Sequence, residues 1–212
     1  MSAELILYSN PMSRGRIARW MLEEVGVPYR VEYLDYATTM HSPEFLAINP
    51  MGKVPTLRHG VAVVTEAAAI CAYLAAAFPE AELEAERGTP AYADYLRWLF
   101  FAAGPVEAAV TAKALGLLAP TEKRAMVGYG DYESVMDTLE HAVAGKTFIA
   151  GDHFTAADLY VGAHIGWGLQ FGTIEPRPAF QAFREMVEAR PAFQRAKALD
   201  DEAMQQQQQQ QQ

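Results

Sequence analysis

The spacing of apolar residues over the first eighty positions predicts alternating strands and helices. An apolar run over 5–8 and an alternating segment over 29–34 have strand character, and between them apolar residues recur at helical spacing over 17–25. Gly26 follows the last of these positions, as is common where a helix ends. A strand, a helix and a second strand in this order predict a parallel pair joined by a right-handed crossover.

The other elements of this N-terminal region are indicated by local capping, turn and breaker signals. They are a helix that begins at Pro43 after Ser42, two strands over 56–58 and 61–64 with a tight turn at His59-Gly60, and an apolar helix over 67–78 stopped by Pro79. Together with the first three elements they predict a βαβαββα domain over residues 1–79.

The pattern changes after Pro79. Residues 80–89 are acidic and polar, which is typical of a linker between domains. Beyond them every periodic segment is helical: 92–118 with an expected kink at Gly104-Pro105, 121–143, 156–171 and 179–199. We therefore expect an α+β chain in which an all-helical domain over 90–204 follows the first domain. The closing glutamines have no apolar face, so residues 205–212 are predicted to be disordered.

Composition and charge remove several classes of function. The chain of 212 residues has 17 basic and 26 acidic residues and a net charge of −9, which argues against a nucleic-acid or anionic-membrane surface. The single cysteine, Cys71, excludes an intrachain disulfide and lies in an apolar helix, where packing is its expected role. The histidines show no metal-ligand spacing, so no metal is expected. No secretory leader or membrane span is visible, and we expect a cytoplasmic protein.

Two neighbouring features predict a site for a small zwitterionic peptide. Pro55 stands between a short apolar run and a hairpin, where it can leave a backbone edge exposed to a peptide. The helix that begins at Glu66-Ala67 offers a carboxylate and free amide groups close by.

Four motifs together indicate one protein family, because they occur along the chain in the order seen in that family. They are Tyr8–Arg16, Lys53-Val54-Pro55, Thr65-Glu66-Ala67 and Phe154–Asp158. From about Leu5 to about Leu199 the chain resembles the cytosolic glutathione transferases, and within them a bacterial, serine-based branch. The resemblance implies a thioredoxin-like N-terminal domain, a helical second domain, a homodimer, and glutathione as co-substrate. It also implies that Thr155–Asp158 is an N-capping box that helps the second domain to fold.

The resemblance assigns most of the glutathione contacts to the first domain. It implies a cis peptide bond at Val54-Pro55, with the main chain of Val54 pairing with glutathione's cysteinyl backbone; an ordinary edge-strand proline is the alternative. Glu66 and the amide of Ala67 would meet the γ-glutamyl end, unless Glu66 only stabilises the helix start. Ala67 replaces the family's usual serine, which removes a hydrogen bond worth about 1 kcal/mol.

A cation is needed for the glycine carboxylate of the tripeptide. His41 and Lys53 stand where similar proteins supply one, and a solvated surface charge is the alternative for each. Arg14, Arg16 and Arg19 crowd a helix start where the helix dipole disfavours positive charge. We expect them to form pairs between domains or subunits, or to compensate a nearby anion.

Catalysis requires glutathione's thiol, with a pKa near ~8.5, to ionise about two pKa units lower, which is about 2.7 kcal/mol of anion stabilisation. A hydroxyl donor at a helix N-terminus can supply much of this. Ser13 is the first candidate, and Ser9, Tyr8 and Asn10 are rivals, because the loop length leaves the register open. Ser13 as a plain helix cap is the alternative.

The second substrate is expected to be a small apolar electrophile. Candidate wall residues are aromatic or kink residues of the helical domain, namely Phe100, Phe101, Pro105, Trp167 and Phe171, with core packing as the alternative. The sequence thus favours a glutathione transferase that conjugates the thiolate to such a substrate. A glutathione-dependent disulfide or peroxide reductase and a non-enzymatic binding module are the alternatives.

Overall fold

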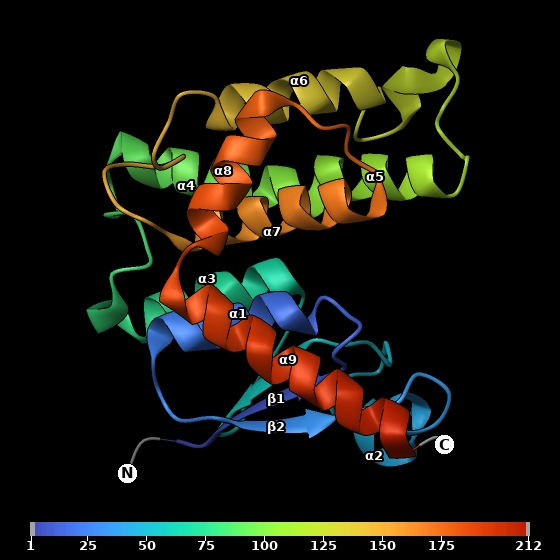
Figure 1. The fold of residues 1–212 in the computed structure, drawn as a ribbon, viewed down its shortest axis with the longest axis vertical. Helices are drawn as coiled ribbons and strands as arrows, with labels where there is room; N and C mark the ends of the chain where they lie inside the picture. Colours follow the sequence, from blue (N-terminus) through green and yellow to red (C-terminus); the bar gives the residue numbers. More distant parts are fainter. Residues whose placement is uncertain (1–2, 211–212) are drawn as a thin grey trace. The chain divides into compact units, whose positions relative to one another are not determined.

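The computed structural model describes residues 3–210, and the chain divides into two compact units. Unit 1 comprises the residues up to Ala81 together with those from Arg190 onward, and unit 2 is Glu82–Ala189. Figure 1 follows the chain by colour, from the blue strands of unit 1 through the green and yellow helices of unit 2 to the red helix α9 of unit 1. No helix of the described part is long and apolar enough to cross a membrane.

Unit 1 is built on a four-stranded sheet of order β2-β1-β3-β4. The strands are β1 Leu5–Ser9, β2 Arg30–Tyr33, β3 Thr56–His59 and β4 Ala62–Thr65. β1 runs parallel to β2 and antiparallel to β3, and β3 pairs with β4 as a hairpin. The predicted parallel pair and the predicted hairpin are both confirmed.

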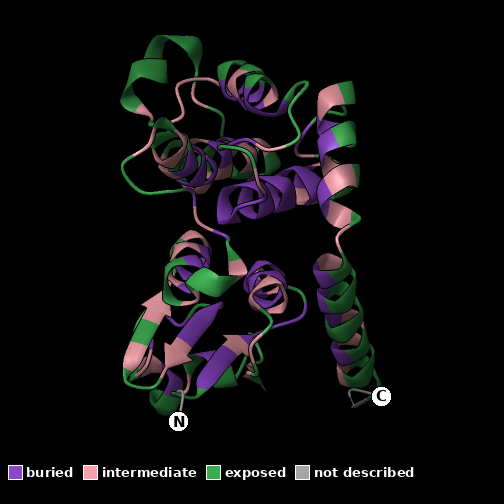
Figure 2. Ribbon diagram, turned by 90° about the vertical axis from the view of Figure 1, so that its left-hand side faces the viewer, coloured by how far each residue is buried: buried purple, intermediate pink, exposed green. Residues whose placement is uncertain are grey.

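Short helices connect these strands in the predicted order. They are α1 Gly15–Val25, α2 Pro43–Leu46 and α3 Ala67–Ala77, with 3-10 turns at Thr39–His41 and Pro79–Ala81. α1 ends where Gly26 adopts a φ of 74°, a conformation that glycine takes without a steric penalty. Both α1 and α3 contain buried residues, among them Ile17, Met21, Ile70 and Leu74, and Figure 2 colours the buried positions of the strands and helices purple. The βαβαββα order predicted for residues 1–79 is therefore present.

The C-terminal helix α9 Pro191–Gln210 packs with α1 in unit 1, although we predicted a helical domain over 90–204 that would have included most of it. The rings of Trp20 and Phe193 meet edge to face with centroids 4.9 Å apart. The buried side chains of Arg19 and Asp200 form an ion pair of 2.8 Å. Helical periodicity predicted one or two helices over 179–199, but it carries no information on which distant helix they pack against.

The glutamines at the end of α9 are helical as far as the structure describes them, through Gln210. The prediction of disorder over 205–212 is therefore wrong for 205–210, and its last two residues lie outside the described part. Glutamine has a good intrinsic helix propensity, and adding residues to an existing helix avoids the unfavourable nucleation step.

All regular secondary structure in the described residues of unit 2 is helical, as predicted. Its helices are α4 Pro90–Phe101, α5 Glu107–Ala114, α6 Tyr132–Val143, α7 Ala156–Phe171 and α8 Pro178–Glu188, with a 3-10 segment at Thr121–Met126. The kink expected at Gly104-Pro105 is a π-helical segment, Ala102–Val106, between α4 and α5. The single helix predicted over 121–143 is interrupted after Met126, because Gly130 adopts a φ of 69° before α6 begins.

The predicted capping box at the start of α7 is present. One carboxylate oxygen of Asp158 accepts hydrogen bonds from the N–H and the Oγ1 of Thr155, each at 2.9 Å. The other accepts the N–H of Ile149 at 2.8 Å. Asp158 is fully buried, so these donors have no access to water as an alternative partner.

We predict that Asp158→Ala destabilises the chain by about 3 kcal/mol, because two buried N–H groups lose their acceptor at about 1–3 kcal/mol each. Chemical denaturation followed by circular dichroism measures the loss. Asp131→Ala is the matched control, since Asp131 caps α6 through the N–H of Ser134 at 2.9 Å but is more exposed. Its expected cost is about 1 kcal/mol. Equal costs for the two variants would contradict the prediction.

Candidate functional site

The sheet register of unit 1 gathers three of the predicted motifs at one end of the sheet. Tyr8 pairs with Thr56, and Thr56 pairs with Thr65. The last residues of β1, the first residues of β3 and the last residues of β4 therefore lie at the same end of the sheet. The loop before α1, the Val54-Pro55 segment and the start of α3 all meet there.

The loop before α1 begins with a tight turn, Asn10–Ser13. The N–H of Ser13 donates to the carbonyl oxygen of Asn10 at 3.0 Å. The Asn10 side chain accepts the N–H of Met12 at 2.9 Å and donates to the carbonyl oxygen of Leu34 at 2.8 Å. Asparagine followed by proline favours such turns, because the amide bonds the backbone two residues on and proline presets its own φ. Asn10 thus connects the loop to the residue after β2. Because its amide already donates there, it is a poorer candidate for the donor to a ligand.

Ser13 closes this turn at the N-terminus of α1. Its hydroxyl donates to the carbonyl oxygen of Asn10 at 2.6 Å and accepts the N–H of Gly15 at 2.9 Å. It therefore stabilises the start of α1, as the alternative interpretation held, from the position before the N-cap residue Arg14. The cap leaves a second role open, because the N–H of Gly15 polarises the hydroxyl and the helix dipole favours negative charge beside it. Turning the proton from Asn10 to a bound sulfur keeps the Gly15 bond intact.

The two rivals on β1 are placed differently. Ser9 is fully buried, and its hydroxyl has no hydrogen-bond partner in the described part of the chain. It lies against Gly15, where a Cβ would overlap the Ser9 oxygen, so both residues are small to let the strand approach the helix start. Tyr8 points to the opposite face of the strand, and its ring packs 5.5 Å from that of Phe45.

A second turn of the same kind, Asn49–Gly52, precedes β3. The Asn49 side chain accepts the N–H of Met51 at 3.1 Å and donates to the carbonyl oxygen of Lys53 at 2.9 Å. Gly52 has a φ of 58°, and a Cβ there would come within 2.9 Å of the His41 ring, so glycine is required. The tripeptide Asn-Pro-Met occurs in both turns and marks them in the sequence, although no role was predicted for them there.

The Val54-Pro55 peptide bond is cis, as the resemblance implied. Within the described part of the chain, the N–H and the carbonyl oxygen of Val54 have no backbone partner. The preceding carbonyl, that of Lys53, is held by Asn49 and by the Thr56 hydroxyl at 3.1 Å. The exposed side chains of His41 and Lys53 flank the same loop.

Glu66 has a strained backbone at the start of α3. Its φ of 65° and ψ of 119° are unusual for a residue with a side chain and cost about 1–3 kcal/mol. The side chain is exposed and makes no capping hydrogen bond, which weakens the alternative that it serves only to begin the helix. Ala67 follows in the first turn, where backbone N–H groups point out of the helix.

The predicted wall residues all lie in unit 2. Phe100 and Phe171 are exposed by 72% and 65%, while the others are partly exposed. The rings of Trp167 and Phe171 contact each other with centroids 5.7 Å apart, and Phe101 meets Trp98 at the same separation. Their exposure is compatible with a substrate wall, which stays a prediction. Cys71 is fully buried, and burial raises the pKa of its thiol, as suits a packing residue.

Comparisons with known proteins agree with the fold and the motifs. Residues 12–77 match the family model of the glutathione S-transferase N-terminal domain, and residues 92–191 match that of the C-terminal domain. The chain is 30% identical to glutathione S-transferase 3 of Zea mays over 92% of its own length and 94% of the relative's.

Solved structures give the same result. A glutathione transferase from Methylococcus capsulatus superposes with a TM-score of 0.76 at 28% identity, covering 93% of this chain and 98% of that one. A sphingomonad glutathione S-transferase complexed with glutathione has a TM-score of 0.74 at 27% identity, covering 92% and 98%. On these matches the chain belongs to the glutathione S-transferase family.

Proposed function

We propose that unit 1 binds glutathione at the end of the sheet where Ser13, Val54 and Glu66 come together, and that the enzyme transfers the glutathione sulfur to an apolar electrophilic carbon. The observation that carries the proposal is this convergence: a hydroxyl at one helix N-terminus, a backbone segment before β3 without backbone partners, and a strained acidic residue at a second helix N-terminus. The solved sphingomonad relative with glutathione supports the choice of ligand.

Each part of glutathione has a complementary group in the described residues. The main chain of Val54 pairs with the cysteinyl backbone in the manner of an added strand. The N–H of Ala67 and the dipole of α3 bind the γ-glutamyl carboxylate, while Glu66 faces the adjacent ammonium. His41 and Lys53 supply positive charge for the glycine carboxylate.

The chemistry requires an ionised sulfur. The Ser13 hydroxyl donates a hydrogen bond to the thiolate, which is stronger than a bond between neutral groups, and the N-terminus of α1 adds its dipole. The thiolate electron pair then forms the carbon–sulfur bond. In a displacement the leaving group departs with its bonding electrons, and in a Michaelis addition the resulting carbanion takes a proton from water.

One observation favours a second candidate. Ala67 offers no hydroxyl to the γ-glutamyl carboxylate, which would suit a binding module that keeps the fold without turnover. Activity with a model aryl halide separates the two candidates, because a binding module gives retention on immobilised glutathione without conjugation. Disulfide or peroxide reduction, the homodimer, the apolar electrophile and the cytoplasmic location stay predictions.

We predict that Ser13→Ala raises the pKa of the bound sulfur and lowers turnover with a model aryl halide about tenfold or more, while calorimetry at about pH 5, where the bound sulfur is protonated, finds nearly unchanged affinity for glutathione. The variant also loses a helix cap, at about 1 kcal/mol of stability. Thr89→Ala is the matched control, since Thr89 likewise bridges two backbone groups at the start of α4, donating to the carbonyl oxygen of Glu86 at 2.6 Å and accepting the N–H of Tyr92 at 3.3 Å.

The control is expected to lose similar stability with no change in the pKa of the sulfur. Ser9→Ala removes a buried hydroxyl without a partner and is expected to keep full turnover. If Ser9→Ala abolished turnover while Ser13→Ala did not, Ser13 would be the wrong hydroxyl.

We predict that Ala67→Ser tightens glutathione binding about threefold to tenfold, because the new hydroxyl donates to a carboxylate at a gain of about 1 kcal/mol or somewhat more. Calorimetric titration of both proteins measures the change. Ala69→Ser, also in the first turn of α3 but exposed, is the control and is expected to leave affinity unchanged. Unchanged or weaker binding by Ala67→Ser would show that the carboxylate does not lie at this helix start.

A further inference from the structure

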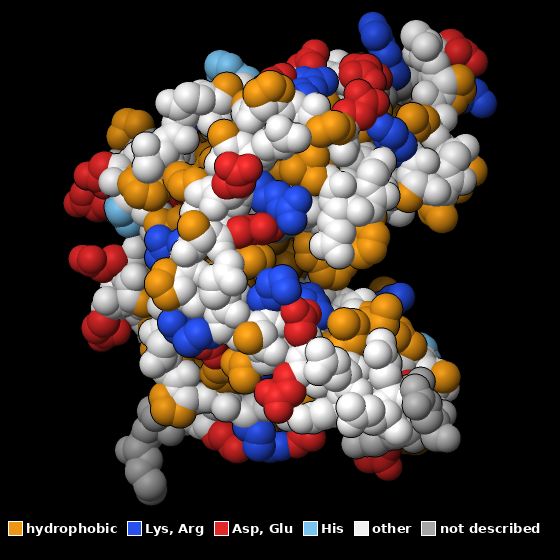
Figure 3. Space-filling model, in the orientation of Figure 1, with side chains coloured by type: hydrophobic (Ala, Val, Ile, Leu, Met, Phe, Trp, Pro, Cys, Tyr) orange, Lys and Arg blue, Asp and Glu red, His pale blue; other side chains and the backbone are white. Residues whose placement is uncertain are grey.

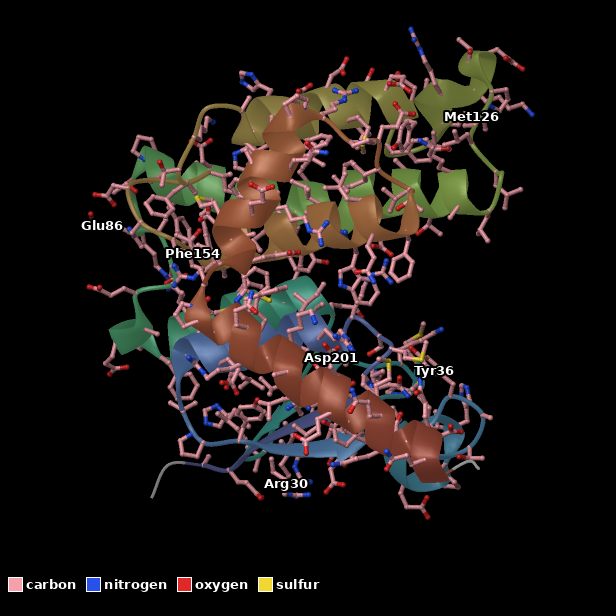
Figure 4. The ribbon with its side chains drawn as sticks, viewed as in Figure 1. Arg30, Tyr36, Glu86, Met126, Phe154 and Asp201 are labelled. Atoms are coloured by element: carbon pink, nitrogen blue, oxygen red, sulfur yellow. The ribbon has the colours of Figure 1, made fainter. Side chains whose placement is uncertain are left out.

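Arg16 connects the C-terminal helix to the turn that carries Ser13. Its Nε donates to the carbonyl oxygen of Pro11 at 2.6 Å. Its Nη2 lies 2.8 Å from the Oδ1 of Asp201 on α9, which is labelled in Figure 4. One planar guanidinium therefore joins a residue near the end of the chain to the loop at the start of α1.

The peptide plane between Pro11 and Met12 is held at both of its polar ends. Its N–H, that of Met12, donates to the side chain of Asn10, and its carbonyl oxygen accepts from Arg16. This is the central peptide of a tight turn, and turns of types I and II differ mainly in the orientation of that plane. Ser13 is the next residue of the same turn, and its hydroxyl donates across the turn to the carbonyl oxygen of Asn10, so a shift of the turn backbone moves that hydroxyl.

Asp201 keeps the long side chain of Arg16 in this position. A free arginine on the surface has several rotamers, and fixing it carries an entropic cost that the carboxylate offsets. Asp201 also accepts from Lys197 at 2.6 Å. Partial burial opposes ionisation, but the bonds from Lys197 and Arg16 outweigh it and lower the pKa of the Asp201 carboxyl.

The Arg16–Asp201 pair is partly buried, with 22% and 32% of its side chains exposed. Ion pairs that stay in contact with water contribute about 1 kcal/mol or less to folding, so stability alone does not account for the additional bond from Arg16 to the turn. The neighbouring pair, Arg19 with Asp200, is buried and fixes the register of α9 on α1. In Figure 3 basic and acidic side chains lie next to one another over the surface of this helix.

We propose that Arg16 is a positioning residue for the thiolate site, and that Asp201 of α9 holds it in place. The C-terminal helix then sets the orientation of the Asn10–Ser13 turn, and through it the reach of the Ser13 hydroxyl. The proposal rests on the function proposed above.

The test titrates glutathione bound to the full chain and follows the ultraviolet absorbance of the thiolate against pH. Asp201→Asn and Arg16→Gln are expected to raise the pKa of the bound sulfur by about half a unit to one unit, which is about threefold to tenfold less thiolate below that pKa. Glutathione affinity is expected to be unchanged at about pH 5, where the bound sulfur is protonated, and to fall by about twofold to threefold at pH 7, because the raised pKa itself weakens thiolate binding.

Arg195→Gln is the matched control, since Arg195 pairs with Glu23 at 3.0 Å between the same two helices but at the far end of α1. It is expected to leave the pKa of the sulfur unchanged, with a change in melting temperature similar to that of Asp201→Asn. An equal pKa rise in Arg195→Gln would overturn the proposal, because α9 would then act only by stabilising the unit. A rise in Arg16→Gln without one in Asp201→Asn would also overturn it, since α9 would have no part.

Wild-type protein that binds glutathione without any thiolate absorbance would refute the proposed function as well as this inference. A normal thiolate in the wild type and in Asp201→Asn would refute the inference alone.

Discussion

The antiparallel pairing of β1, β3 and β4 is the constraint on which the site depends. It brings the end of β1, the start of β3 and the end of β4 to the same end of the sheet. Two helix N-termini and one unpaired backbone segment then face the same region, and each suits a different part of a zwitterionic peptide. Recognition by main chain and helix dipoles requires few specific side chains, so the substitution at Ala67 removes one bond and leaves the arrangement in place.

Two turns that share the tripeptide Asn-Pro-Met hold the segments at this end of the sheet. Asn10 and Asn49 each accept the N–H of a methionine two residues on and donate to a more distant carbonyl. Both are nearly buried, at 6% and 3% exposure, so their amides must be paired within the protein. These internally paired turns hold the loops on each side of the site in place. The strained backbone of Glu66 and the unpaired main chain of Val54 therefore stay accessible to a ligand.

Local signals in the sequence predicted the elements of both units well. The order βαβαββα, the cap at Ser42 and the capping box at Asp158 depend on neighbouring residues, and all are present. The position of α9 was missed because it depends on pairs such as Arg19 with Asp200, which are far apart in the chain. The sequence left four candidates open for the activating group, and only packing places them. Ser9 is enclosed, the ring of Tyr8 packs on Phe45, the Asn10 amide is bonded to Leu34, and Ser13 lies at the helix start, which is the basis for proposing it.

The central claim is that unit 1 binds glutathione and ionises its sulfur. Calorimetric titration of the full chain with glutathione at pH 7, in two buffers of different ionisation enthalpy, counts the protons released on binding. A fall of about two units in the pKa of the thiol predicts saturable binding with release of about 0.7 proton, and none with S-methylglutathione, which has no thiol proton. Absence of binding, or binding of glutathione without proton release, would contradict the account.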